Sequence, residues 1–221
     1  MALTLPSAKL GLPPEARKRK RRLDRLDGSL ATLAGVTTTR PPRPRVRIEE
    51  ATLADIPGIV AVRVNAAEDL TARFGGGHWS GHATEKGVAW DMRQGKVLVA
   101  RRGRAIVATL KIATRKPWAI DVSWFAPCKK PWYLTNMAVD PAHQGKGIGK
   151  RSVLEAARLV RTWGGDAVRL DAYDAVEGAG AGPFYEKCGF TEVGRATYRV
   201  TPLIYYELRL TNSGKRAADN A

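Results

Sequence analysis

The alternation of apolar and polar positions along the chain predicts a sheet of six to seven strands. Residues 46–50 (Val-Arg-Ile-Glu-Glu) alternate as a half-buried strand does. Two longer apolar runs are separated only by Arg102-Gly103-Arg104, a short glycine-containing connection that favours an antiparallel hairpin. The predicted strands together cover residues 46–50, 96–101, 105–113, 132–139, 168–173, 190–193 and 203–210.

Apolar residues recur at helical spacing between several of these strands. Thr52 and Asp55 resemble a capping box, which opens a helix whose apolar stripe runs from Ile56 to Leu70. Strands and helices together indicate an α+β fold, a mixed sheet with helices packed on it. Further helices are predicted at residues 90–93, 148–163 and 181–187, and irregular segments at 73–87 and 114–131.

Composition supports one folded domain with tails. The chain has 221 residues, of which 44% are hydrophobic and 26% are charged, as is typical of a globular protein. Its net charge of +16 divides evenly, because residues 1–45 carry 11 Lys and Arg against 3 Asp and Glu, and residues 46–221 carry 26 against 18. The first segment is basic, rich in proline and poor in large apolar residues. We therefore expect a disordered basic tail at 1–45, a folded domain at 46–212 and a disordered tail at 213–221.

Several classes of protein are disfavoured by features that the sequence lacks. No segment reaches the roughly 18 consecutive apolar residues of a membrane-spanning helix. The N-terminus has no apolar run of the kind found in secretory signals. The two cysteines, Cys128 and Cys188, lie far apart in sequence, and no metal-ligand spacing is present. We therefore expect a cytoplasmic protein with no membrane partner, no disulfide and no metal.

A glycine-rich turn follows the predicted strand 132–139. After Asp140-Pro141 the chain reads Gln144-Gly145-Lys146-Gly147-Ile148-Gly149, and a helix then begins with two basic residues, Lys150 and Arg151. Glycines allow the backbone to approach a ligand closely, and the free N–H groups at a helix start attract anions. The spacing is neither that of a P-loop nor that of a dinucleotide fingerprint. The turn predicts a pyrophosphate site, with a ligand-free helix entry as the alternative.

The order of strand, Gln-x-x-Gly-x-Gly turn, helix and strand, followed by Phe184-Tyr185-Glu186-Lys187-Cys188-Gly189-Phe190, resembles the GNAT family of N-acetyltransferases over residues 46 to about 210. The resemblance implies the GNAT fold, a mixed and mostly antiparallel twisted sheet flanked by helices, and acetyl-CoA as co-substrate. It also implies that the main chain of the strand before the turn bonds the pantetheine arm. The implied cofactor-binding residues are Met137, Ala138, Val139, Gln144, Gly145, Lys146, Gly147, Ile148, Gly149 and Lys150.

Acetyl transfer to an amine needs a base for the ammonium, stabilisation of the carbonyl oxygen and a proton donor for the departing sulfur. The resemblance assigns the last role to Tyr185, whose alternative role is packing on the sheet, and it places a backbone donor near Met137 or Ala138. Some members of the family carry a Glu where this chain has Tyr133, so the base stays open. The candidates are Asp171, Asp121, Glu68, Asp69 and His78, or a chain of water molecules.

The resemblance to the GNAT family implies that the acceptor amine binds near the segments 68–82 and 114–131. The sequence leaves open whether that amine belongs to a small molecule or to a protein, and whether another acyl donor is used. The alternative hypothesis is a protein anchored to nucleic acid or to the ribosome by its basic tail, with a degenerate or regulatory GNAT domain. Aromatic and acidic residues that would suit a cationic amine are Trp79, Trp118, Trp124, Phe125, Glu68, Asp69 and Asp121.

Overall fold

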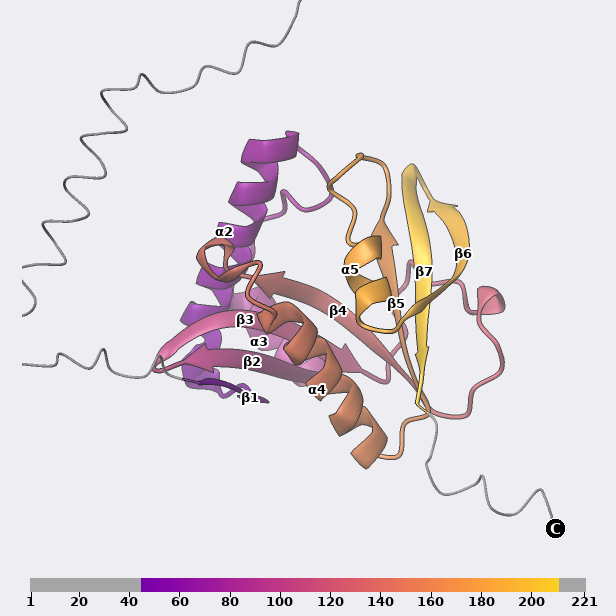
Figure 1. Ribbon diagram of the computed structural model, residues 1–221, viewed down its shortest axis with the longest axis horizontal. Helices are drawn as coiled ribbons and strands as arrows, with labels where there is room; N and C mark the ends of the chain where they lie inside the picture. The colour runs from indigo at the N-terminus through magenta and orange to yellow at the C-terminus, as the bar shows by residue number, and fades with distance from the viewer. Residues whose placement is uncertain (1–44, 211–221) are drawn as a thin grey trace, which may run out of the picture. The chain divides into compact units, whose positions relative to one another are not determined.

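Seven strands form one sheet, and helices cover both of its faces (Figure 1). The protein is represented by a computed structural model, which describes residues 45–210. The strands lie in the order β1-β2-β3-β4-β5-β7-β6. Neighbouring strands are antiparallel except for β4 and β5, which are parallel. The sheet is mixed and mostly antiparallel, which confirms the predicted fold class.

The elements follow the β-α-α-β-β-β-α-β-α-β-β order along the chain. The strands are β1 (Val46–Glu50), β2 (Lys96–Arg102), β3 (Ala105–Ala113), β4 (Pro131–Val139), β5 (Ala167–Tyr173), β6 (Thr191–Tyr198) and β7 (Thr201–Arg209). The helices are α2 (Ile56–Phe74), α3 (Glu85–Gln94), α4 (Ile148–Thr162) and α5 (Gly182–Lys187), and short 3-10 helices are η1 (Leu53–Asp55), η2 (Val122–Trp124) and η3 (Pro141–His143).

Two elements, α3 and β6, extend well beyond their predicted ranges, and α2 also continues to Phe74, inside the segment predicted to be irregular. The helix expected at 90–93 is α3, which begins at Glu85 because the Thr84 side chain caps it by accepting a hydrogen bond from the Gly87 N–H at 3.1 Å. The strand expected at 190–193 is β6, which continues to Tyr198. Its second half has few large apolar residues, and pairing with β7 rather than apolar alternation keeps it extended.

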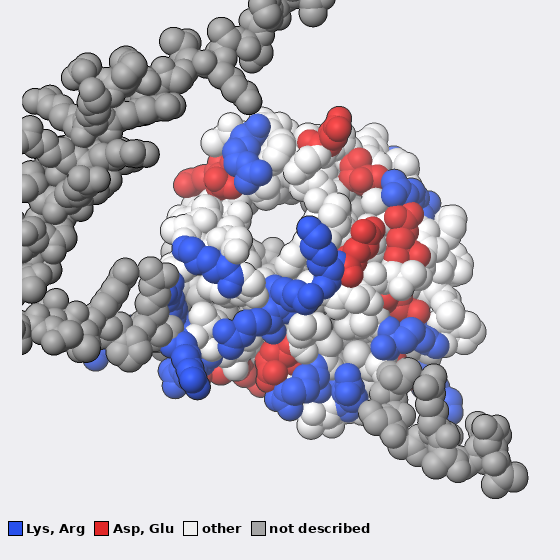
Figure 2. Space-filling view, in the orientation of Figure 1, with Lys and Arg blue, Asp and Glu red and all other residues white. Residues whose placement is uncertain are grey.

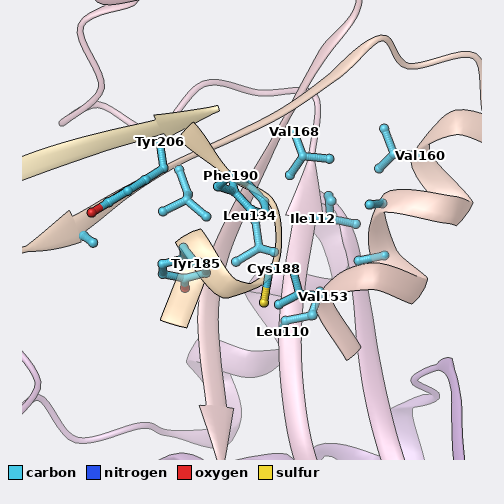
Figure 3. Close-up of a cluster of buried hydrophobic side chains, with 14 of the residues drawn as sticks. Leu110, Ile112, Leu134, Val153, Val160, Val168, Tyr185, Cys188, Phe190 and Tyr206 are labelled. Carbon is cyan, nitrogen blue, oxygen red and sulfur yellow. The ribbon is translucent and has the colours of Figure 1, made fainter. Parts of the chain in front are cut away.

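The core lies on both faces of the sheet, as β2 illustrates. Leu98 packs with residues of α4 and α5, whereas Val97 and Val99 pack with residues of α2 and α3. Because successive side chains of a strand point to opposite faces, α4 and α5 cover one face and α2 and α3 cover the other. Figure 3 shows the larger cluster, which includes Leu110, Ile112, Leu134, Val153, Val160, Tyr185 and Phe190.

The two parallel strands stay together over a short distance only. β4 pairs with β5 through residues 131–133, which face residues 167–169. Beyond these pairs β4 continues to Val139 and β5 continues to Tyr173, and the two strands diverge (Figure 1). The facing edges of the diverging halves therefore have no strand partner among residues 45–210.

The predicted tails at 1–45 and 213–221 fall outside the described residues, apart from residue 45. The hypothesis of a nucleic-acid anchor depends on the first tail and falls outside them as well. Among the helices of residues 45–210, none has the length and apolar character needed to span a membrane.

Candidate active site

A β-bulge interrupts β4 where it leaves β5. Thr135 faces Lys111 of β3 and Ala138 faces Thr109, so Asn136 and Met137 together oppose one β3 residue. Asn136 has a positive φ of 53°, which non-glycine residues adopt only occasionally. The bulge takes the main chain around Met137 out of the regular ladder, next to the edge of β4 that has no strand partner within the described part of the chain.

A polar cluster holds this bulge from the α2 and α3 side. The Asn136 side-chain amide donates a hydrogen bond of 2.7 Å to the Asp91 carboxylate. Asp91 also pairs with Arg63 of α2 at 2.7 Å and with Lys111 of β3 at 2.9 Å. These three side chains expose only 12–15% of their surface, so the ion pairs are shielded from water. The sequence reasoning missed Asp91, since its partners are 20 to 45 residues away.

The glycine-rich turn forms an open helix start. The Gln144 side chain donates a hydrogen bond to the Val139 carbonyl at 3.1 Å and folds the turn back on β4. Gly145 and Gly147 have φ values of 69° and 73°, which favour glycine over any other residue. Gly147 is the N-cap of α4, and no side chain caps the helix there. Its first N–H groups remain available for an anion.

Basic side chains surround this helix start. Lys146, Lys150 and Arg151 are exposed. Lys146 bonds the Ala142 carbonyl, and Arg151 donates to the Val46 carbonyl at 3.2 Å. Figure 2 shows Lys and Arg side chains gathered over the region of α4, beside a hollow in the surface. The positive field adds to the helix dipole and favours a polyphosphate.

The predicted cofactor-binding residues form one continuous segment of strand, turn and helix. Met137, Ala138 and Val139 end β4, and Gln144 to Lys150 lead into α4. Within this set the Ile148 side chain is 4% exposed and belongs to a core cluster, so its backbone alone faces the turn. Gly149 is also buried, since a Cβ there would lie 3.2 Å from Phe184, and it lets α4 and α5 pack closely.

Tyr185 on α5 reaches the point where β4 and β5 diverge. Its ring is 7% exposed and packs against Phe184 and Phe190 at centroid distances of 5.1 Å and 5.7 Å. It also lines a cavity of about 310 Å³. Burial raises the pKa of Tyr185, and the charge of Asp171 raises it further, so the phenol keeps its proton at neutral pH. Tyr185 can therefore pack in the core and still carry a hydroxyl proton at the cavity.

Two of the candidate bases lie at the same cavity. Asp171 of β5 lines it, and burial raises the pKa of this carboxyl. His78 lines it too, and its ring stacks on Tyr173 with a centroid distance of 5.8 Å. Both were among the candidates that the sequence left open, and the structure places them at the same cavity as Tyr185.

The other candidate bases are engaged elsewhere. Asp121 accepts hydrogen bonds from the N–H and hydroxyl of Ser123, and Asp69 pairs with Arg73 on the surface of α2. Glu68 lines a different cavity, along α2. None of the three lines the cavity that holds Tyr185.

The aromatic residues predicted around the acceptor divide into two groups. Trp118 lines the 310 Å³ cavity and contacts Tyr198 at a centroid distance of 4.4 Å. Trp79 lines a neighbouring cavity of about 500 Å³ between α2 and β4. Trp124 covers Gly194, and Phe125 is buried against Arg169, so both stabilise the fold instead. The sequence reasoning missed Tyr198, which lies in the unpredicted half of β6.

A metal site is not formed by clustered side chains in this part of the chain. Within residues 45–210, no group of three or more His, Cys, Asp or Glu residues is placed to hold a metal ion.

The Cys128 thiol donates a hydrogen bond to Asp166 at 2.6 Å. Burial, and to a lesser extent this bond, raises the pKa of the thiol to about 11. A thiol with this pKa is a poor nucleophile at neutral pH.

The sequence matches one protein family over more than half of its length. The model of the acetyltransferase (GNAT) family covers residues 65–190 of the 221. This span contains the bulge, the glycine-rich turn, Asp171 and Tyr185. No curated protein sequence matches the chain significantly.

Solved structures with the same fold are similar at low sequence identity. The ribosomal-protein-S18-alanine N-acetyltransferase of Escherichia coli has a TM-score of 0.57 and 18% identity, covering 78% of this chain and 98% of its own. The YncA putative acetyltransferase of Salmonella typhimurium, solved with acetyl-CoA, has a TM-score of 0.56 and 18% identity, covering 78% and 98%. The PaiA N-acetyltransferase of Thermoplasma acidophilum, solved with coenzyme A, has a TM-score of 0.57 and 15% identity, covering 75% and 99%. At these identities the likeness concerns the fold.

Proposed function

Since the chain belongs to the acetyltransferase (GNAT) family, we propose that it transfers the acetyl group of acetyl-CoA to a primary amine by direct attack of the amine on the thioester. The observation that carries the proposal is the juxtaposition of an uncapped glycine-rich helix start, a bulged strand edge and a buried tyrosine around one divergence of the sheet. Bound acetyl-CoA and coenzyme A in two structures of the same fold support the choice of donor.

The donor site follows from the segment of strand, turn and helix. The pyrophosphate would accept hydrogen bonds from the N–H groups at the start of α4, with Lys146 and Lys150 adding positive charge. The pantetheine arm carries amide groups, which would pair with the edge of β4 around Met137 to Val139 as an added strand does. That edge has no strand partner among residues 45–210, so its backbone groups can bond the arm, apart from the Val139 carbonyl that accepts from Gln144.

Each group near the point where β4 and β5 diverge has one role in the proposed reaction. The amine nitrogen forms a bond to the carbonyl carbon, and the carbon–sulfur bond breaks. Asp171 takes the proton that the ammonium must lose, and its raised pKa brings it closer to that task. The bulged main chain near Met137 or Ala138 donates to the carbonyl oxygen, a contribution worth about 3 kcal/mol for one donor. Tyr185 donates its hydroxyl proton toward the departing sulfur.

Titration calorimetry with acetyl-CoA tests the donor site. We expect Gly147→Ala to weaken acetyl-CoA binding about tenfold, because alanine at a φ of 73° carries about 1–2 kcal/mol of strain that a shift of the turn relieves. Gly164→Ala is the matched control, since Gly164 has a φ of 79° and follows the opposite end of α4. Absence of binding by the unmodified protein at millimolar acetyl-CoA, or equal weakening by both substitutions, would contradict the proposal.

A further inference from the structure

The 310 Å³ cavity lies on the acceptor side of the divergence. It is lined from β4 and the loop before it, from β5, from α5, from the loop after α2 and from the β6–β7 hairpin. None of its lining residues belongs to α4 or to the glycine-rich turn. If the turn holds the phosphates, as the proposed function requires, this cavity leaves space for the acceptor beside Asp171 and Tyr185. Its size is at the lower end of small-molecule sites.

Charge in the cavity is confined to one carboxylate. Asp171 is the only Asp or Glu among its lining residues, and no Lys or Arg lines it. An ammonium group that enters the cavity therefore meets one carboxylate, among aromatic and aliphatic side chains and the polar side chains of His78, Asn136 and two threonines. Such surroundings strengthen a charge pair relative to bulk water.

The outer wall of the cavity is aromatic. Trp118 and Tyr198 pack against each other there, and Trp118 leaves 71% of its surface exposed. An exposed tryptophan beside a cavity contributes little to the core and offers a flat apolar surface to a ligand. A flat ring would stack on this wall, whereas a linear chain would cover less of it.

The neighbouring groove is basic. It shares Trp118 and Asn136 with the cavity, and Arg115 and Lys116 line it as well. Lys111 and Asp91 also line it, but they are paired with each other, and Asp91 pairs with Arg63 too. An acceptor that extends into this groove with a second positive charge is therefore repelled.

We propose that the acceptor is a compact primary monoamine with a flat ring, whose nitrogen pairs with Asp171 and whose ring packs on Trp118 and Tyr198. This inference rests on the proposed acetyl transfer. It selects a small molecule over a peptide N-terminus or a lysine side chain, and a monoamine over a polyamine.

Steady-state release of coenzyme A by the full chain tests the inference. The acceptors are 2-phenylethylamine, n-butylamine, spermidine, a peptide with an N-terminal alanine and a lysine-containing peptide. We expect kcat/KM for 2-phenylethylamine to exceed that of each other acceptor by about tenfold or more, since aromatic contacts add to the area that a ring buries.

Two tryptophan substitutions test whether the preference for an amine with a ring comes from the aromatic wall of the cavity. Trp118→Ala is expected to raise KM for 2-phenylethylamine about tenfold and to change KM for n-butylamine less than about twofold. Trp124→Ala is the matched control, because Trp124 is an exposed tryptophan of the same loop that does not line the cavity. Both variants should keep the acetyl-CoA affinity of the unmodified chain.

The outcomes separate the inference from the proposed function. If acetyl-CoA binds and a peptide or spermidine is acetylated at least as well as 2-phenylethylamine, the inference is overturned and the acetyltransferase proposal stands. Equal effects of Trp118→Ala and Trp124→Ala on KM for 2-phenylethylamine also overturn it. If acetyl-CoA does not bind at all, the proposed function fails and the inference fails with it.

Discussion

Replacement of Asp91 by alanine is expected to destabilise the fold and to slow acetyl transfer. The substitution leaves Arg63 and Lys111 without their carboxylate, and their side chains are only 13% and 15% exposed. It also removes the acceptor of the Asn136 amide, which holds the bulge of β4. One change therefore affects both the packing between α2 and α3 and the backbone at the divergence.

The cost to stability follows from the burial of the cluster. Removal of one partner from a buried ion pair costs about 3–5 kcal/mol. We expect about 3 kcal/mol for Asp91→Ala, the lower end of that range, because water reaches part of each side chain. A domain of this size loses about 2–4 °C of melting temperature per kcal/mol, so the expected fall is about 6–12 °C. Asp174→Ala is the control, since its pair with Arg195 is 40–60% exposed and is worth less than about 1 kcal/mol.

The effect of Asp91→Ala on kcat shows whether Asp91 positions the bulge of β4 or only stabilises the fold. We expect kcat to fall about tenfold in Asp91→Ala at a temperature where the variant is folded, because a misplaced backbone donor loses part of the stabilisation it gives the carbonyl oxygen. The acetyl-CoA dissociation constant should change less than about twofold. Asn136→Gly tolerates the φ of 53° but lacks the amide, so it should show an intermediate kcat.

Thermal unfolding and steady-state kinetics together decide the matter. A melting temperature within about 2 °C of the unmodified chain would refute the reasoning about buried charge. A clear loss of stability with unchanged kcat would refute the positioning role of Asp91. The conclusion that its ion pairs stabilise the fold would still stand.

Two further predictions concern the groups at the cavity. Tyr185→Phe should lower kcat about 10- to 100-fold and leave the acetyl-CoA dissociation constant within about twofold, as measured by coenzyme A release and calorimetry; an unchanged kcat would show that Tyr185 only packs. Asp171→Asn should lower kcat/KM and yet raise the melting temperature at pH 8. Burial raises the pKa of Asp171, so its stabilising contribution is present below the unfolded value of about 3.9 and is lost as the pH rises through the folded pKa. The gain from Asn should thus vanish near pH 3, and a variant less stable than the parent at pH 8 would contradict this sign.

Local sequence patterns predicted the features that depend on neighbouring residues. The hairpin of β2 and β3, the glycine-rich turn before a helix and the capping box are confirmed, the last by a hydrogen bond of 2.8 Å from the Thr52 N–H to the Asp55 carboxylate. Each is set by residues a few positions apart, so spacing alone reveals it. The family resemblance then supplied the fold class, which the strand order confirms.

Features that depend on distant residues were not predictable in this way. Asp91 meets Asn136 across 45 positions, and Trp118 meets Tyr198 across 80 positions. Periodicity carries no signal for such contacts, because it describes which face a residue occupies and not what lies opposite. The sequence likewise did not show that Asp171 of β5 and His78 of the loop after α2 line the same cavity.

The short seam between β4 and β5 has a mechanical consequence. Three residue pairs join the four strands on one side to the three on the other, whereas β5 and β7 share seven pairs. The two halves of the sheet are therefore held together mainly by side chains, through the cluster in which Leu134 of β4, Leu170 of β5 and Tyr185 meet. The same side-chain contacts that keep the two halves of the sheet joined therefore also set the width of the opening between β4 and β5.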